Sequence, residues 1–289
     1  MSLSRGSGRA SGLSPAAALV RRHDRDRFQT ALFAPGEDRE ALFALYAFNY
    51  EIARVREGVR EPMLGQIRLQ WWREAIDAAY AAAPPRRHEI VEAVTGLIRQ
   101  KGLSRAPFDR LIDARERDLD DASPPSLSAL EDYADGTSAA LIELALEALA
   151  AAAPAARAAA RHVGIAYAFA GLLRAMPLHA RTGRSFIPSE LAAECGLDPR
   201  DYAVLRTTPA LRQVVEAVAR SARRHLAAAR ELRNDVPRAA LPALLPARVA
   251  DQALRRLERA AYDPFSEAVS RTDPLQSWRL AYAALRGRF

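Results

Sequence analysis

Few residues of this chain combine a reactive type with a spacing that supports chemistry. The five histidines show neither an i, i+4 pair nor a neighbouring carboxylate at the spacing of a zinc site. A single cysteine, Cys195, excludes an internal disulfide and a cysteine-based zinc site. No nucleophile-elbow serine, phosphate loop or dinucleotide glycine fingerprint is visible in a folded context. Enzymes that depend on these motifs are therefore excluded.

One acidic group stands just before a predicted helix start. Asp118, Asp120 and Asp121 lie a few residues ahead of a pair of prolines. Clustered carboxylates are ligands for hard cations. The same position favours helix capping, because the N-terminus of a helix attracts negative charge. We interpret the three aspartates as capping and solvated residues and predict no metal site here.

Basic side chains outnumber acidic ones, with 42 Lys and Arg against 35 Asp and Glu, so the formal net charge is +7. Such an excess attracts anionic lipid, nucleic acid or diphosphates. Five arginines spaced by about one helical turn form a stripe: Arg220, Arg223, Arg224, Arg230 and Arg233. We interpret the stripe as a solvated helix face. No nucleic-acid-binding motif accompanies the charge, so no nucleic-acid partner is predicted.

The elements that must position any site are helices. Helical periodicity extends over most of the chain, and alternating strand patterns are nearly absent. Proline and glycine divide the chain into about ten segments of helix length. The alanine-rich stretch 139–160 predicts two buried helices that meet near Pro154. Ser128 and Glu131 have the spacing of a capping box.

These patterns predict an all-α protein with one helical domain over residues 15–289, preceded by a flexible tail over residues 1–14. No apolar run reaches the ~20 residues that a transmembrane helix needs. No signal peptide is visible either. We therefore expect a cytoplasmic protein that associates peripherally with an anionic membrane surface.

Two segments, residues 28–72 and 164–188, carry a resemblance to a known family. The matching residues are Pro35, Arg39, Ala44-Leu45-Tyr46-Ala47-Phe48, Leu173-Arg174, Gly183-Arg184, Phe186 and Pro188. Their types and order resemble the squalene/phytoene synthase family, over most of residues 15–289. The resemblance implies an isoprenoid-synthase-like helical bundle around a central cavity.

The resemblance also implies where a metal site belongs. Such enzymes ionise an allylic diphosphate with magnesium ions held by aspartates on two facing helices, and the first motif reads Asp-Asp-x-x-Asp. Here that place reads Ala-Arg-Val-Arg-Glu over residues 53–57, and only Glu57 has a carboxylate. The acidic places of the second motif hold Ala175 and His179, and histidine is a poor magnesium ligand. We therefore predict no catalytic residue, no metal ligand and no cofactor.

Further details resemble the branch of this family formed by the mitochondrial complex I (NADH dehydrogenase) assembly factors. These details are Ala47-Phe48-Asn49, Leu119-Asp120-Asp121, Gln70-Trp71-Trp72 and Gln276-Ser277-Trp278-Arg279. The branch implies a catalytically degenerate protein whose partners are subunits or assembly intermediates of a respiratory complex. It also implies an isoprenoid or lipid ligand and, in a eukaryote, a place in the mitochondrial matrix.

The alternative is a prenyltransferase that condenses isoprenoid diphosphates with an altered metal site. Arginines would then hold the diphosphate, because a guanidinium stabilises a leaving phosphate. Only this alternative requires Mg²⁺.

Eight residues are candidates for lining the cavity or binding its ligand: Tyr46, Asn49, Arg54, Glu57, Trp71, Tyr167, Arg174 and Arg184. Each has a second interpretation. The aromatic residues suit core packing, Asn49 suits a buried hydrogen bond, and the arginines suit ion pairs or solvent. We expect an elongated apolar pocket between a helix over residues 41–57 and another over 164–174, with Arg54 or Arg174 near its mouth.

Overall fold

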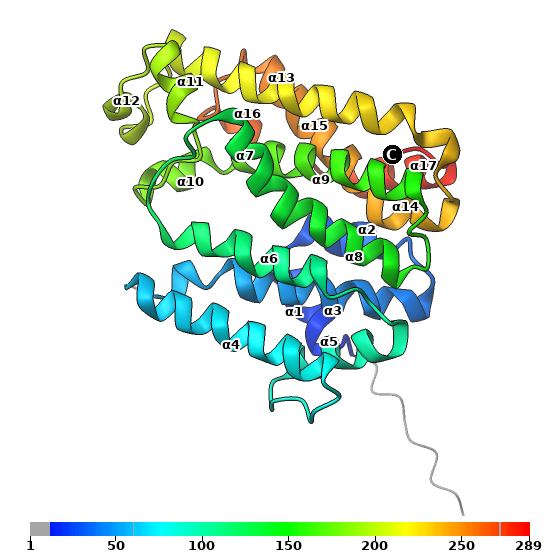
Figure 1. Ribbon diagram of the computed structural model, residues 1–289. Helices are drawn as coiled ribbons and strands as arrows, with labels where there is room; N and C mark the ends of the chain where they lie inside the picture. The colour runs from blue at the N-terminus through cyan, green and yellow to red at the C-terminus, as the bar shows by residue number, and fades with distance from the viewer. Residues whose placement is uncertain (1–11, 60, 272) are drawn as a thin grey trace, which may run out of the picture.

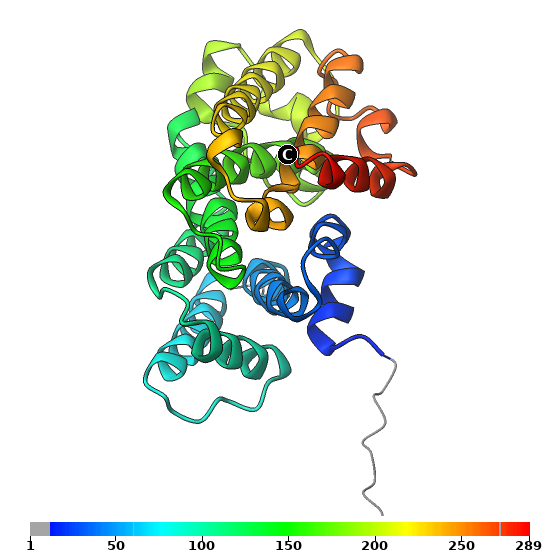
Figure 2. The same cartoon turned by 90° about the vertical axis from the view of Figure 1, so that its right-hand side faces the viewer.

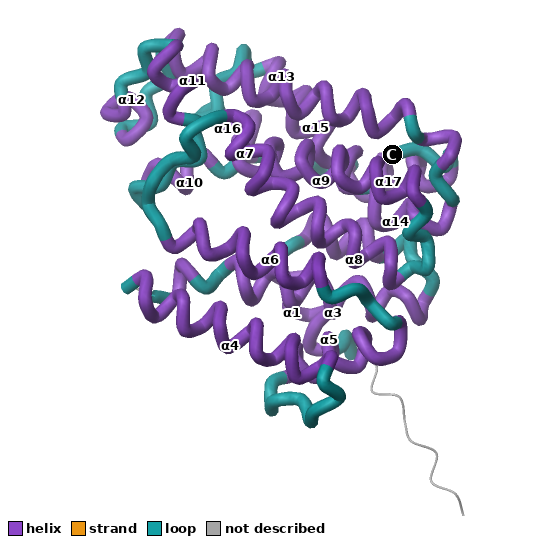
Figure 3. The backbone as a smooth tube through the Cα atoms, in the orientation of Figure 1, coloured by secondary structure: helices purple, strands orange, loops and turns teal. Residues whose placement is uncertain are grey.

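The computed structural model describes residues 12–59, 61–271 and 273–289, and within these ranges it contains helices and loops but no strand (Figures 1 and 3). The helices are α1 (Pro15–His23), α2 (Arg25–Ala31), α3 (Gly36–Ala53), α4 (Pro62–Tyr80), α5 (Glu89–Lys101), α6 (Ala106–Glu116), α7 (Leu127–Ala134), α8 (Ala140–Ala148), α9 (Pro154–Arg174), α10 (Met176–Arg181), α11 (Ser189–Glu194), α12 (Pro199–Ala203), α13 (Pro209–Glu231), α14 (Leu241–Leu244), α15 (Pro246–Arg259), α16 (Glu267–Ser270) and α17 (Gln276–Leu285). The predicted all-α class is confirmed. Most of the predicted tail lies outside the described residues.

Proline and glycine set many of the helix boundaries. Proline stands at the start of the long helices α4, α9, α13 and α15, where its fixed φ suits the helix and its missing N–H is not needed. Gly102 ends α5 with a φ of 64°, a left-handed conformation that glycine adopts easily. The described ranges contain more helices than the ten expected, because these residues also delimit short helices such as α10, α12 and α14.

The N-terminus of α7 is capped by a different serine from the one expected. The Ser126 hydroxyl accepts a hydrogen bond from the Ala129 N–H at 3.1 Å. The expectation of a capping box at Ser128 is therefore wrong. The Glu131 carboxylate instead accepts a hydrogen bond from the Ser221 hydroxyl of α13 at 2.7 Å.

Helix α9 is central and packs against α8, α13 and α15. It also crosses the π-helical turn Asp135–Ala139, which joins α7 to α8. The crossing needs Gly164, because a Cβ there would lie 2.4 Å from the Ala139 Cα. The alanine-rich stretch does form two buried helices, α8 and α9, that meet near Pro154.

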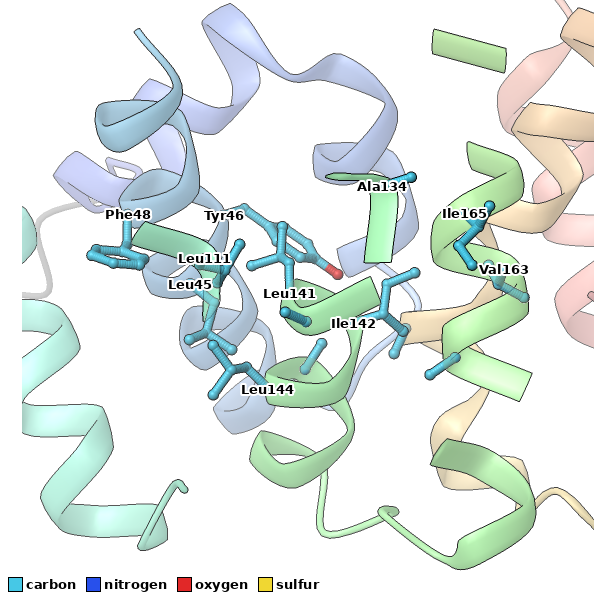
Figure 4. Packing of buried hydrophobic residues seen from close by; sticks show 14 of the residues in the cluster. Leu45, Tyr46, Phe48, Leu111, Ala134, Leu141, Ile142, Leu144, Val163 and Ile165 are labelled. Atoms are coloured by element: carbon cyan, nitrogen blue, oxygen red, sulfur yellow. The ribbon is translucent and has the colours of Figure 1, made fainter. Parts of the chain in front are cut away.

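The bundle places its N-terminal helices on one side and its C-terminal helices on the other, with α8 and α9 between them (Figure 2). Helix α8 contacts both α3 and α9. Its Leu141 and Ile142 are buried, the first toward Tyr46 of α3 and the second toward α9 (Figure 4). Apolar side chains thus fill much of the space between α3 and α9. Within the described ranges, no helix has the length and apolar content to cross a bilayer.

Candidate functional site

One end of the bundle holds a buried carboxylate, Asp118, in the short turn that follows α6. Its side chain accepts hydrogen bonds from the Arg115 guanidinium at 3.1 Å and from the Tyr133 hydroxyl at 2.9 Å. The Arg184 guanidinium lies 3.3 Å away. Asp118 is only 6% exposed, so its interpretation as a capping or solvated residue is wrong. We call Asp118, Arg115, Tyr133 and Arg184 the Asp118 cluster.

Different elements position this cluster. Arg115 lies in the last turn of α6, Tyr133 lies on α7, and Arg184 lies in the loop after α10. Asn49 of α3 is buried beside Arg115, and its side-chain oxygen accepts a long hydrogen bond of 3.5 Å from that guanidinium. Burial raises the pKa of the Tyr133 phenol far above its ordinary value, so its hydroxyl donates to Asp118 at neutral pH.

A hollow of about 360 Å³ opens beside the Asp118 cluster. It is lined by residues 117, 118 and 120–125, by Ala129, Asp132 and Tyr133 of α7, and by the segment 184–186. Two further carboxylates of the loop before α7 are already engaged. Asp121 pairs with the Arg56 guanidinium at 2.7 Å, and Asp120 accepts a hydrogen bond from a backbone N–H at 3.0 Å. Arginine therefore pairs with two of the three carboxylates that the sequence presents here, Asp118 and Asp121.

The other side chains around the Asp118 cluster are unfavourable for binding a cation. Burial, together with the nearby Arg184 guanidinium, lowers the pKa of His179 to about 4, so its ring is neutral at pH 7. The Arg184 guanidinium lies over the Phe186 ring, 5.1 Å from its centroid. Glu57 is exposed in the turn after α3. The donor set does not fit Mg²⁺, and among the described residues no group of three or more His, Cys, Asp or Glu side chains is arranged for a metal.

A buried arginine, Arg27, lies between α3 and α9. The Arg27 guanidinium of α2 pairs with Asp24 at 2.8 Å. It lies 4.7 Å from the ring centroid of Tyr167 on α9 and 5.8 Å from that of Tyr46 on α3. Burial raises the pKa of both phenols, so they are neutral partners for the cation. The place where we expected an elongated apolar pocket thus contains a charged side chain.

The other predicted residues lie apart from these two groups. Arg54 is exposed at the end of α3 and pairs weakly with Glu51 at 3.5 Å. Trp71 packs edge-on against Trp72, with ring centroids 5.1 Å apart. Both Arg54 and Trp71 line a second hollow of about 200 Å³.

Arg174, at the end of α9, pairs with Asp26 at 3.0 Å. The structure therefore brings Asn49 to Arg115 of the Asp118 cluster, which also contains Arg184, and it brings Tyr46 and Tyr167 to Arg27. It does not place Arg54 or Arg174 at the mouth of a pocket between α3 and α9.

Sequence reasoning missed Arg27 and Arg115 and misjudged Asp118. The available signal was weak: each arginine lies three residues from an aspartate, in the pairs Asp24–Arg27 and Arg115–Asp118. Such i, i+3 pairs are common on exposed helix surfaces. Only the packing of other helices shows that these pairs are buried.

Known proteins are similar to this chain in sequence over most of its length. The sequence model of the squalene/phytoene synthase family matches residues 20–282. The NADH dehydrogenase (ubiquinone) complex I assembly factor 6 of Bos taurus is 32% identical over 271 residues, which cover 91% of this chain and 81% of the relative. A presqualene diphosphate synthase of Rhodopseudomonas palustris is 30% identical over 205 residues, which cover 71% of this chain and 72% of that enzyme.

A solved structure is similar along most of the chain. The squalene synthase HpnC of Alicyclobacillus acidocaldarius superposes with a TM-score of 0.77 at 21% identity, covering 86% of this chain and 94% of the other. At this identity the similarity establishes the fold alone.

Proposed function

The chain belongs to the squalene/phytoene synthase family, and we propose that within it this protein assists the assembly of a respiratory complex I instead of condensing isoprenoid diphosphates. The name of the bovine relative supports the assembly role, because that protein matches 91% of this chain. The partners would be subunits or assembly intermediates of the complex.

The observation that carries the proposal is the pairing of carboxylates with arginines at the Asp118 end. Magnesium needs several free oxygen ligands, and a diphosphate-ionising site needs magnesium. Arg115 and Arg184 surround the buried Asp118, and the mostly exposed Asp121 pairs with Arg56. A cation placed here would have to displace these ion pairs in a partly buried site, which is costly.

We also propose a peripheral location on the cytoplasmic face of a membrane, or on the matrix face in a eukaryote. The net charge of +7 supports attraction to an anionic surface. The hollow beside the Asp118 cluster, with Phe186 and Tyr133 on its wall, is the proposed place for an isoprenoid or lipid.

A deletion in the source organism tests the assembly role. We expect less assembled complex I on native gels and lower NADH oxidation by membranes, both restored by the wild-type gene. We also expect restoration by a variant with Glu57→Gln, which removes the carboxylate left in the first motif. Normal complex I in the deletion strain would overturn the proposal.

The second candidate function is a prenyltransferase with an altered metal site. The 30% identity to a presqualene diphosphate synthase favours it, as does the position of Arg184 at the wall of the hollow. Incubation with farnesyl diphosphate and Mg²⁺ would then give a condensed product, and Arg184→Gln would abolish that product. No product with the wild-type protein would eliminate this candidate.

A further inference from the structure

A groove of about 620 Å³ lies between α13 and α15, and its lining shares no residue with the hollow beside the Asp118 cluster. Leu254 and Ala219 contribute apolar surface, and Tyr262 lines it just beyond the end of α15. Five arginines line the groove: Arg220, Arg223 and Arg230 from α13, and Arg255 and Arg259 from α15. The groove therefore has an apolar component and strongly basic walls.

The carboxylate of Asp251 lies among these arginines and is 2% exposed. It accepts hydrogen bonds from Arg223 at 2.8 Å and from Arg255 at 2.9 Å, and the Arg230 guanidinium lies 3.2 Å away. One carboxylate balances one guanidinium. Asp251 therefore organises three arginines and leaves most of their positive charge available to another anion.

The remaining acidic side chains do not balance the groove. Glu258 lines it and pairs with Arg223 at 3.2 Å, and Glu216 pairs with Arg220 at 3.1 Å. Five arginines against these two carboxylates and Asp251 leave an excess of two positive charges. Within the described chain, Arg259 has no ion pair.

The neighbouring Arg248 lies one turn before Asp251 on α15 and is partly buried near the same charges. Burial lowers its pKa below the ordinary value, and the positive charges of Arg230 and Arg255 lower it further. The attraction of Asp251 does not compensate for these effects. Burial is therefore the main reason for the lowered pKa of Arg248, and the surrounding arginines add to it.

We propose that the groove between α13 and α15 binds a phosphate-bearing anion with at least two negative charges. Guanidinium groups suit this ligand because their planar forks match phosphate oxygens in pairs. The anion is either a soluble diphosphate or the headgroup of an anionic phospholipid. The apolar surface of Leu254 and the ring of Tyr262 accommodate the organic part of such a molecule.

The test removes groove charge without exposing Asp251. In the double variant Arg255→Gln/Arg259→Gln, Arg223 and Arg230 stay in place to hold the buried carboxylate. We expect calorimetry with magnesium-free inorganic diphosphate in 50 mM NaCl to show binding weakened at least about tenfold, because charged hydrogen bonds to phosphate are lost. The matched control, Arg105→Gln/Arg206→Gln, removes the same charge from exposed positions elsewhere and should bind as the wild type does.

The variant Glu258→Gln is expected to strengthen diphosphate binding instead of weakening it. Glu258→Gln removes an exposed negative charge from the groove, so diphosphate should bind about two- to fivefold more tightly. A purely structural role of the arginines would not produce the gain with Glu258→Gln.

Vesicles distinguish the two sources of phosphate. Binding to vesicles that contain cardiolipin, whose headgroup carries two phosphates, but not to phosphatidylcholine vesicles, with loss in Arg255→Gln/Arg259→Gln, identifies a lipid headgroup. Binding of diphosphate without vesicle binding identifies a soluble ligand. The proposal is overturned if neither probe binds, or if the groove variant and its matched control weaken binding equally.

Discussion

Two buried aspartates, Asp118 and Asp251, both bind arginines but differ in what their arginines face. The side chains of Arg115 and Arg184 around Asp118 are 15% and 22% exposed, and Tyr133 also donates to the carboxylate. The three arginines around Asp251 are 34% to 56% exposed and line an open groove. The same pairing therefore satisfies a carboxylate inside the bundle in one region and presents cationic groups to solvent in the other.

The largest expected effect is the loss of Asp118. Asp118→Ala leaves the buried Arg115 without its carboxylate, so we expect the free energy of unfolding to fall by about 3–5 kcal/mol. Urea unfolding followed by circular dichroism measures it. Asp121→Ala is the control, because Asp121 is mostly exposed and its loss should change stability far less. A similar decrease in the free energy of unfolding in both variants would contradict the view that Asp118 and Arg115 depend on each other because they are buried.

Asp251 should be less important for stability. In Asp251→Ala the partly exposed arginines can turn into water, so we expect a loss of about 1–2 kcal/mol in the same urea experiment. Since the arginines outweigh the effect of burial, the pKa of Asp251 is lowered in the folded protein. Its stabilisation is therefore present above its unfolded pKa and lost as the pH falls through the lower folded pKa. If Asp251→Ala costs as much as Asp118→Ala, the contrast between the two regions fails.

A pH-dependent effect of about the same size is expected from His179. Its folded pKa of about 4 lies below the unfolded value, so the unfolded chain takes up a proton first as the pH falls from 7 to 5. Stability should decrease over this window by about 1–2 kcal/mol more in the wild type than in His179→Gln. Equal losses in the two proteins at pH 5 would show that this histidine is not held neutral by its surroundings.

The smallest expected effect on stability is that of Glu258→Gln. Glu258 is 61% exposed and its partner Arg223 also binds Asp251, so the melting temperature should shift by no more than about one degree. Differential scanning calorimetry in low salt measures it. A large decrease in the melting temperature would show that the groove depends on Glu258 for its structure. That result would contradict the description of the groove as an open, charge-rich surface.

Local patterns predicted the helical class and many helix boundaries, because periodicity and proline act over a few residues. The short motifs at residues 28–72 and 164–188 were sufficient for the family, which the match over residues 20–282 confirms. The predicted absence of a cofactor and the roles of the eight candidate residues stay predictions, because only binding and activity measurements test them.

The two aspartate regions could not be predicted in the same way. Asp118 and Arg184 are 66 residues apart in sequence, and Arg223 and Asp251 are 28 apart. The stripe 220–233 looked like a solvated face, but Arg223 and Arg230 turn toward a carboxylate on another helix. Similarly, Arg27 resembles a surface residue of a short helix until α3 and α9 enclose it.

The central claim is that arginines have taken the place of magnesium chemistry at the Asp118 end. The most direct test measures diphosphate release from farnesyl or geranylgeranyl diphosphate by the purified protein, with magnesium varied from zero to millimolar concentrations. We predict no release above the protein-free control at any magnesium concentration. Magnesium-dependent turnover in the range of typical enzymes, roughly 1–10³ s⁻¹, would contradict the claim.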